Sequence, residues 1–179
     1  EAMTGKNCEE VFYNLEDTLK YIKSVFNNAK DLKVAIAKYI EENTAMKKEI
    51  EGFRSQAVDR TAKSLVERAQ IINGVHVVKA VLPTDPASAK DIVFKVREQI
   101  SETLVCVLGS VHSGKPMLSV MLSDDMVNEH GLNAGNMVRE AAKLIQGGGG
   151  GQPHYAQAGG KNADGLSVAV DKVIELANI

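Results

Sequence analysis

The sequence predicts an α+β protein in which a long helical hairpin or coiled-coil arm precedes a compact α/β domain. Apolar residues recur every three or four positions over the first 72 residues, and no proline occurs before Pro83, as is typical of helices. From residue 74 onward, β-branched runs alternate with capped helical segments, and a glycine-rich segment follows. These observations predict an arm over residues 1–73 and a domain over residues 74–179, with a glycine-rich loop at 147–160.

Composition limits the function classes. The 179 residues carry 21 Lys+Arg against 23 Asp+Glu, a formal net charge of −2, so no broad basic surface for nucleic acid is expected and DNA is not an expected partner. No apolar stretch approaches 18 residues, which excludes a membrane span. Two cysteines cannot build a disulfide framework, which favours a reducing, cytoplasmic compartment. The start at Glu1-Ala2 lacks an initiator Met and a signal pattern, so a fragment of a longer protein is expected.

The first predicted helix covers residues 8–26. Asn7 followed by Glu10 matches a capping box at a helix start. Five apolar residues then share one face at spacings of three or four: Val11, Leu15, Leu19, Ile22 and Phe26. Asn27-Asn28 interrupts this pattern, and Asn28 with Asp31 predicts the cap of the next helix.

The second predicted helix is long, covering about residues 28–72, and it carries a heptad-like seam with one polar member, Asn43. The predicted self-association surface consists of Leu32, Ile36, Tyr39, Met46, Ile50 and Phe53. Either the first helix covers this seam as an intramolecular hairpin, or a second copy of the chain covers it. Asn73-Gly74 predicts the end of the helix.

The domain is predicted to follow the order β-α-β-β-α-α-loop-α. Its predicted strands are Val75–Leu82, Thr103–Val111 and Met117–Ser123. Asp85 before Pro86 predicts the N-cap and first position of a helix that ends near Gln99. Asn133 predicts the cap of a later helix, and Leu166–Ala177 predicts the last one.

Several catalytic and metal motifs are excluded. Gly109–Lys115 resembles a P-loop, but Pro116 follows in place of Ser or Thr and a strand follows in place of a helix, so this segment is predicted to be a hairpin turn. The four His and two Cys lack ligand spacing, so no metal site is predicted. No G-x-S-x-G pattern occurs, and no catalytic residue is predicted.

The most informative segment is Gly147–Lys161, in which seven of fifteen residues are glycine. Glycines permit close backbone approach, and their bare N–H groups can form an anion-binding nest. Arg139, Lys143 and Lys161 against Glu140 make the region locally positive. It is therefore predicted to be a backbone-lined platform for phosphate, sugar or stacked bases. The alternative is a passive flexible loop, which is the usual role of polyglycine.

This segment, ending in Ala156-Gln157-Ala158-Gly159-Gly160-Lys161, resembles the signature of the DHHA1-type domain at the C-terminus of bacterial-type alanyl-tRNA synthetases. The opening Glu1–Gly5 also resembles the segment that leaves the editing domain of those enzymes, and the helical arm matches too. The family commonly has Arg-Pro-Asp-Met where this chain has Gln152–Tyr155, so no arginine is available there for a phosphate contact.

The resemblance implies a non-catalytic module of an alanine–tRNA ligase. The parent enzyme would attach alanine to its tRNA with ATP and magnesium and would edit with a zinc-bearing domain, all upstream of Glu1, so no cofactor is expected in this chain. The module would bind the elbow of tRNA(Ala) and support oligomerisation of the enzyme. The tRNA-binding role falls on Gly147, Gly148, Gly149, Gly150, Gly151, His154, Gln157, Gly159, Gly160 and Lys161, with Arg139 and Lys143 in support.

Two alternatives remain open at this point. The chain can be a purely structural oligomerisation element with a passive glycine loop. It can also be the nucleic-acid-binding DHHA1 domain of a DHH phosphoesterase, although the Asp-His-His metal motif of that family does not occur in the sequence.

Overall fold

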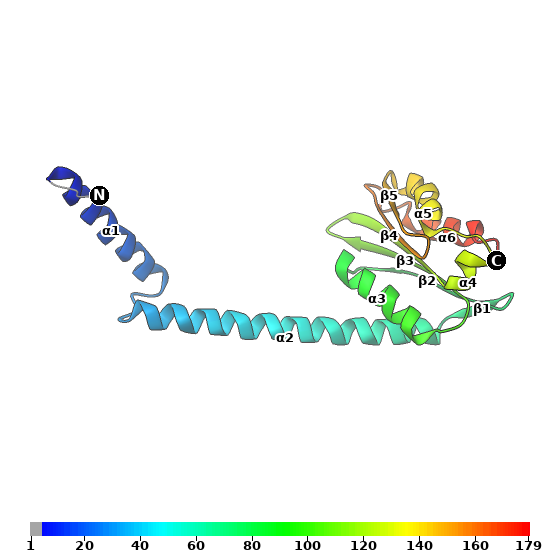
Figure 1. Ribbon diagram of the computed structural model, residues 1–179, viewed down its shortest axis with the longest axis horizontal. Helices are drawn as coiled ribbons and strands as arrows, with labels where there is room; N and C mark the ends of the chain where they lie inside the picture. Colours follow the sequence, from blue (N-terminus) through cyan, green and yellow to red (C-terminus); the bar gives the residue numbers. More distant parts are fainter. Residues whose placement is uncertain (1–4) are drawn as a thin grey trace. The chain divides into compact units, whose positions relative to one another are not determined.

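The computed structural model describes residues 5–179 and divides into two compact units, Glu1–Gly52 and Phe53–Ile179 (Figure 1). Residues 1–4 of the opening segment, which resembles the segment that leaves the editing domain, lie outside the described residues. Helix α1 spans Lys6–Val25 with Gly5 at its N-cap position. The predicted capping box is therefore wrong, because the helix already begins before Asn7. The predicted boundary at residue 73 remains a prediction.

Helix α2 begins with a side-chain cap. It spans Leu32–Glu67, and the Val34 amide donates to Asp31 Oδ1 at 3.1 Å. Asn27 and Asn28 both adopt left-handed backbone angles, with φ of 54° and 56°, and the Asn28 amide bonds the Lys23 carbonyl at 2.8 Å. These two residues therefore close the end of α1. Asp31, and not Asn28, caps α2 as predicted, and α2 begins after the predicted residue 28.

The long helix also ends earlier than predicted. Residues Gln70–Ile72 form strand β1, which pairs antiparallel with β2, Val75–Leu82. Asn73 and Gly74 form the two-residue turn between them, with φ of 52° and 82°. Positive φ at both positions is the type I′ geometry that Asn-Gly favours in hairpins. The prediction that Asn73-Gly74 ends a helix is therefore wrong.

The second unit is built on a six-stranded sheet with the order β1-β2-β3-β4-β6-β5. The remaining strands are β3 (Leu104–His112), β4 (Lys115–Leu122), β5 (Gly148–Gly151) and β6 (Tyr155–Gly159). Among the described strands, only β2 and β3 pair in parallel, and α3 (Pro86–Gln99) makes this crossover. The other helical elements are α4 (Asp124–Asn128), α5 (Ala134–Ala142), the short 3-10 helix η1 (Lys143–Ile145) and α6 (Leu166–Leu176). The α+β fold class is thus confirmed.

The glycine run is strand, not loop. Gly148–Gly151 pairs with Tyr155–Gly159, and β5 is the last strand at that edge of the sheet. The predicted loop at 147–160 is therefore wrong over most of its length. A run of glycines has no alternation of apolar and polar side chains, so the pattern that identifies strands was missing.

Helices cover both faces of the sheet, and each face has its own apolar core. Leu118, Val120 and Ala158 belong to the core under α5 and α6. Cys106, Leu108 and Met121 belong to the core under α3 and the C-terminal part of α2. Adjacent residues of one strand point to opposite faces, so Met117, Ser119 and Met121 share the α3 face.

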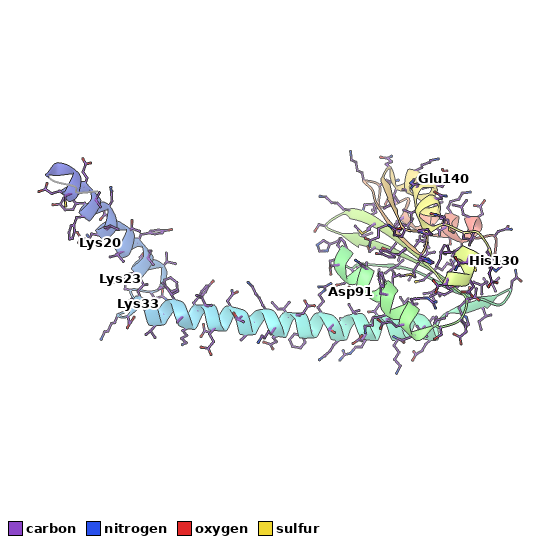
Figure 2. All side chains as sticks on the ribbon, viewed as in Figure 1. Lys20, Lys23, Lys33, Asp91, His130 and Glu140 are labelled. Atoms are coloured by element: carbon purple, nitrogen blue, oxygen red, sulfur yellow. The ribbon has the colours of Figure 1, made fainter. Side chains whose placement is uncertain are left out.

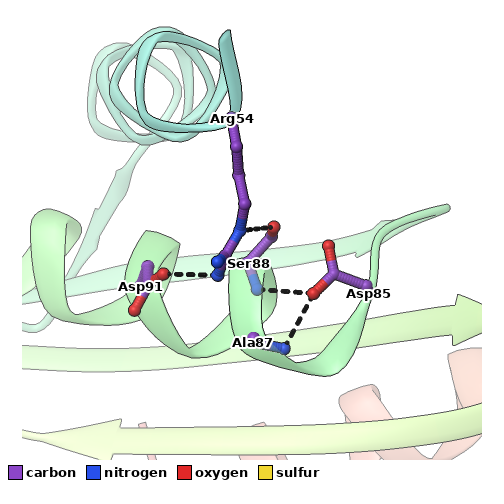
Figure 3. Close-up of polar contacts among 5 residues, drawn as sticks. All are labelled: Arg54, Asp85, Ala87, Ser88 and Asp91. Carbon is purple, nitrogen blue, oxygen red and sulfur yellow. Dashed lines mark hydrogen bonds and ion pairs between the residues drawn. The ribbon is translucent and has the colours of Figure 1, made fainter. Parts of the chain in front are cut away.

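Arg54 joins α2 to α3 within the second unit (Figure 3). Its Nε donates to Ser88 Oγ at 2.9 Å, and its terminal nitrogen lies 2.7 Å from Asp91 Oδ2. Asp85 caps α3 as predicted, accepting the amides of Ala87 and Ser88 at 3.0 Å. The hydroxyl and amide of Ser88 hold the pKa of the Asp85 carboxyl below its ordinary value. The start of α3 is therefore fully satisfied.

Within residues 5–179, no helix combines the length and apolarity needed to cross a membrane.

Candidate nucleic-acid interface

A surface pocket of about 610 Å³ lies where the β3–β4 turn meets the glycine edge of the sheet. We call it the glycine pocket. Its lining residues are Pro86, Ser110, His112, Ser113, Lys115, Pro116, Met117, Gln146, Gly147, Gly148, Gly159, Gly160 and Lys161. Pockets of about 300–1,000 Å³ are the size that holds small organic ligands. Five of the predicted tRNA-binding residues therefore line one pocket.

The β3–β4 turn is held against the glycine segment by backbone pairing. Ser113 and Gly114 form a two-residue turn with φ of 50° and 74°, which confirms the hairpin prediction for this segment. Strand β4 then pairs with β6, with Met117 opposite Gly159. The Gly160 amide donates to the Pro116 carbonyl at 2.9 Å. Two segments distant in sequence thus form one rigid site.

The backbone amides near the pocket are already used. The Gly147 amide donates to Ala142 and the Lys161 amide to Ile145, both at 2.9 Å, while the Gly160 amide bonds Pro116. The predicted nest of bare N–H groups is therefore wrong for these three residues. An anion beside these three residues would be met by side chains and not by their amides.

The glycines serve two purposes that alternate along β5. A Cβ on Gly147, Gly149 or Gly151 would overlap the carbonyl oxygen of Gly159, Gln157 or Tyr155 respectively. At Gly148 a Cβ would meet nothing within 4 Å, and the same holds at its cross-strand partner Gly159. Gly147 and the odd-numbered glycines of β5 therefore permit close packing on β6. Gly148 and Gly159 leave open space.

The charge of the pocket is positive. Lys115 and Lys161 line it, and neither forms an ion pair within residues 5–179. His112 adds an imidazole, and no Asp or Glu is among these lining residues. A chain of net charge −2 thus presents a local cationic site.

The other predicted residues lie elsewhere. Lys143 pairs with Glu140 on the same helical segment at 2.6 Å; Figure 2 labels Glu140 on α5. His154 precedes β6, at the end opposite Gly159, with its Nδ1 3.3 Å from Asp124 Oδ1. Arg139 donates to Asn136 at 2.9 Å, and its guanidinium lies 3.7–3.8 Å from the position of a Cβ on Gly150.

Gln157 lies beside the pocket on the α3 face. Its Nε2 donates to the buried Ser119 Oγ at 3.0 Å, on the strand between β3 and β6. Next to it, Tyr155 packs on Phe94 with ring centroids 5.0 Å apart, and burial raises the pKa of Tyr155 to about 12. These contacts make Gln157 a structural neighbour of the glycine pocket.

Among the lining residues that sequence reasoning missed, two carry basic side chains, His112 and Lys115. The only feature of the sequence that drew attention to them was the P-loop-like pattern of Gly109–Lys115. That pattern correctly indicated a turn but did not indicate which residues the turn would contact.

No metal-binding chemistry was found in the described part of the chain. No group of three or more His, Cys, Asp or Glu side chains in residues 5–179 is arranged to hold an ion. Cys106 is buried in the sheet, where desolvation raises the pKa of its thiol to about 12, and Cys8 is exposed on α1. Cys106 is therefore a core residue without thiolate reactivity.

Comparison with known proteins identifies relatives over the whole chain. Residues 73–178 match the family described as DHHA1 domain. The chain is 52% identical to an alanine–tRNA ligase of Bacteroides fragilis and 51% identical to one of Bacteroides thetaiotaomicron, in each case over 100% of this chain and 20% of the relative. The chain thus spans about one fifth of the length of these relatives.

A solved structure shares the fold. The C-Ala domain of Aquifex aeolicus alanyl-tRNA synthetase aligns with a TM-score of 0.55 and 23% identity, covering 62% of this chain and 98% of that domain. The family match covers more than half of the chain, and the ligase relatives align along all of it. The chain belongs to the DHHA1 domain family, in the form found in alanine–tRNA ligases.

Proposed function

We propose that this chain is a non-catalytic module of an alanine–tRNA ligase that binds tRNA(Ala), at the elbow of the tRNA, through the glycine pocket. By holding the tRNA it would assist alanylation and editing by other parts of the ligase. ATP, magnesium and the editing-domain zinc are proposed for those other parts. The cytoplasm is the compartment this role requires.

The observation that carries the proposal is that lysines without ion-pair partners and uncovered glycine backbone lie in the same pocket. In the part of the chain that the structure describes, Lys115 and Lys161 line the pocket without carboxylate partners, and no side chain covers the backbone of Gly148 and Gly159. Lysines contact phosphate without reading sequence, and bare backbone admits the flat face of a base. Both features suit an RNA whose shape is recognised more than its sequence.

The number of charges sets the expected affinity. Two lysines release few counterions, so binding by this chain alone is expected to be weak and to have a shallow salt dependence. It would add usefully to the affinity of a ligase that contacts the same tRNA elsewhere, because linked contacts raise the effective concentration.

Fluorescence anisotropy with labelled tRNA(Ala) at two salt concentrations tests the proposal. The proposal is supported if the wild-type chain binds the tRNA and Lys161→Ala weakens this binding without changing the free energy of unfolding. A wild-type chain that leaves the tRNA anisotropy unchanged refutes it.

A second function is favoured by the exposed seam of α2. Four of its apolar residues are more than half exposed in the single chain: Tyr39 at 55%, Met46 at 51%, Ile50 at 66% and Phe53 at 63%. Leu32 and Ile36 are partly buried near the turn, where Phe26 packs edge-on against Tyr39 at 5.9 Å. We propose that a second copy of the chain covers this seam, as heptad seams pair in coiled coils.

A further inference from the structure

We propose that the β3–β4 turn is the second half of the RNA site and that His112 and Lys115 act with Lys161 to hold one unpaired nucleotide. The phosphate of the nucleotide would lie between Lys115 and Lys161, and its base would lie over the Gly148–Gly159 pair. This inference rests on the proposed function and adds a ligand class and two residues to it.

The first argument is the fixed geometry of the turn. His112 and Lys115 are opposite each other in the β3–β4 ladder, directly before and after the Ser113-Gly114 turn. The pairing of β4 with β6 and the Gly160–Pro116 hydrogen bond hold this turn beside Lys161. Because these are sheet contacts and not flexible-loop contacts, Lys115 and Lys161 line the same pocket without any rearrangement.

The second argument is the distribution of charge. Within residues 5–179, each lysine or arginine near the glycine edge other than Lys115 and Lys161 has a polar partner: Lys143 bonds Glu140, and Arg139 bonds Asn136. The two pocket lysines have none, and the amides of Gly147, Gly160 and Lys161 are already bonded to carbonyls. An entering phosphate would therefore meet two ammonium groups, and these three amides are not free to bind it.

The third argument is the shape and the lining of the pocket. Gly148 and Gly159 are cross-strand partners with no atom within 4 Å of either Cβ position, and Pro86 and Met117 add apolar surface beside them. Unpaired bases are bound on such flat surfaces with phosphates held by basic side chains. The imidazole of His112 supplies a stacking face or a hydrogen bond at the rim. A pocket of about 610 Å³ suits one nucleotide and not a duplex.

Two measurements on the 179-residue chain test this inference. The first is tRNA(Ala) affinity of His112→Ala, Lys115→Ala and the double variant. His130→Ala and Lys172→Ala serve as matched controls, since each removes the same residue type from a surface outside the pocket. The second is an amide chemical-shift titration with a nucleoside 5′-monophosphate, compared with inorganic phosphate.

The double variant is expected to lose about tenfold or more in tRNA affinity, with Lys115→Ala alone lowering the salt slope by about one unit. The controls should match the wild type. The monophosphate should shift the amides of Lys115, Gly148 and Gly159, and inorganic phosphate should shift those near the lysines alone.

Each adverse result has a distinct meaning. If the double variant binds tRNA like the wild type while Lys161→Ala weakens binding, the turn is not part of the site and the inference is overturned, although the proposed function stands. If the wild type binds no tRNA but the monophosphate shifts the pocket amides, tRNA binding fails and the nucleotide site stands. If neither ligand binds, both are refuted.

Discussion

Gly148 of β5 lies directly opposite Gly159 of β6, and the space beyond both α-carbons is open. One residue further along β5, a Cβ on Gly149 would overlap the Gln157 carbonyl oxygen and crowd the Ala158 side chain. Neighbouring glycines of one run therefore have different roles. Gly149 is required for the packing of β5 on β6. Gly148 faces the glycine pocket, and a side chain there is not expected to lower the free energy of unfolding.

The first prediction separates these two roles by stability. Gly149→Ala should lower the free energy of unfolding by about 2 kcal/mol or more, because backbone overlap forces β5 away from β6. Gly148→Ala should stay within about 0.5 kcal/mol of the wild type, as substitutions at open surface positions do. Urea denaturation followed by circular dichroism measures both. Equal stability of the two variants would contradict the assigned packing of β5.

The second prediction concerns the attachment of α2 to α3. Arg54→Ala removes the bond to the buried Ser88 and the contact with Asp91, so it should cost about 1–2 kcal/mol of unfolding free energy. Thermal and urea unfolding measure the loss.

A matched control exists on the same two helices. Lys95 of α3 lies 4.0 Å from Asp59 of α2, and both side chains are largely exposed. Lys95→Ala should therefore leave stability within error of the wild type, since exposed ion pairs contribute little. A loss as large as that of Arg54→Ala would show that net charge, and not the Ser88 bond, determines the effect.

The third prediction follows from the lowered pKa of Asp85. A carboxyl whose pKa is lower in the folded than in the unfolded state stabilises the fold above the unfolded value, near 3.8, and loses this contribution as the pH falls through the folded value. Asp85→Asn keeps an N-cap acceptor but cannot titrate. Between pH 5 and pH 3, unfolding free energy should therefore fall less steeply in Asp85→Asn than in the wild type.

Part of the acid sensitivity should remain in that variant. Asp125 also has a lowered pKa, mainly because the Thr103 hydroxyl donates to its carboxylate at 2.5 Å. Urea titrations at a series of pH values give both slopes. Identical slopes in wild type and Asp85→Asn would show that Asp85 does not contribute to acid unfolding.

The fourth prediction tests the seam of α2. Met46→Glu with Phe53→Glu should abolish concentration-dependent association, because charges at seam positions cannot be buried in a pair of helices. Sedimentation velocity at several concentrations measures this. Lys48 is exposed and lies two residues from the seam position Met46, so Lys48→Glu should leave association unchanged. A wild-type chain that remains monomeric at every concentration would refute self-association through the arm.

Local patterns predicted those elements whose determinants lie within a few residues. Asp85 and Pro86 fixed the start of α3, and Asn133 accepts the Asn136 amide at 3.1 Å as a cap should. The run Val75–Leu82 is a strand with the predicted bounds. In each case the physical cause is a cap or a β-branched run that the sequence displays directly.

Features that depend on distant residues were not predictable in this way. The polyglycine strand β5 has no side-chain pattern, and its conformation is imposed by β6. Strand β1 has only three residues, too few for a clear pattern. Asn-Gly occurs both at the ends of helices and in hairpin turns, so the pairing of β1 with β2 decides that Asn73-Gly74 forms a hairpin turn. The approach of Lys115 to Lys161 depends on the sheet order β3-β4-β6, which no local pattern encodes.

The central claim is that the glycine pocket binds tRNA, and Gly148→Val tests it most directly. The added side chain fills the pocket without meeting any atom within 4 Å at its Cβ, so the fold should be retained. Gly52→Val, at another open position outside the pocket, is the matched control. The dissociation constant for tRNA(Ala) should rise about tenfold or more in Gly148→Val and stay unchanged in Gly52→Val. Wild-type affinity in a folded Gly148→Val chain would contradict the claim.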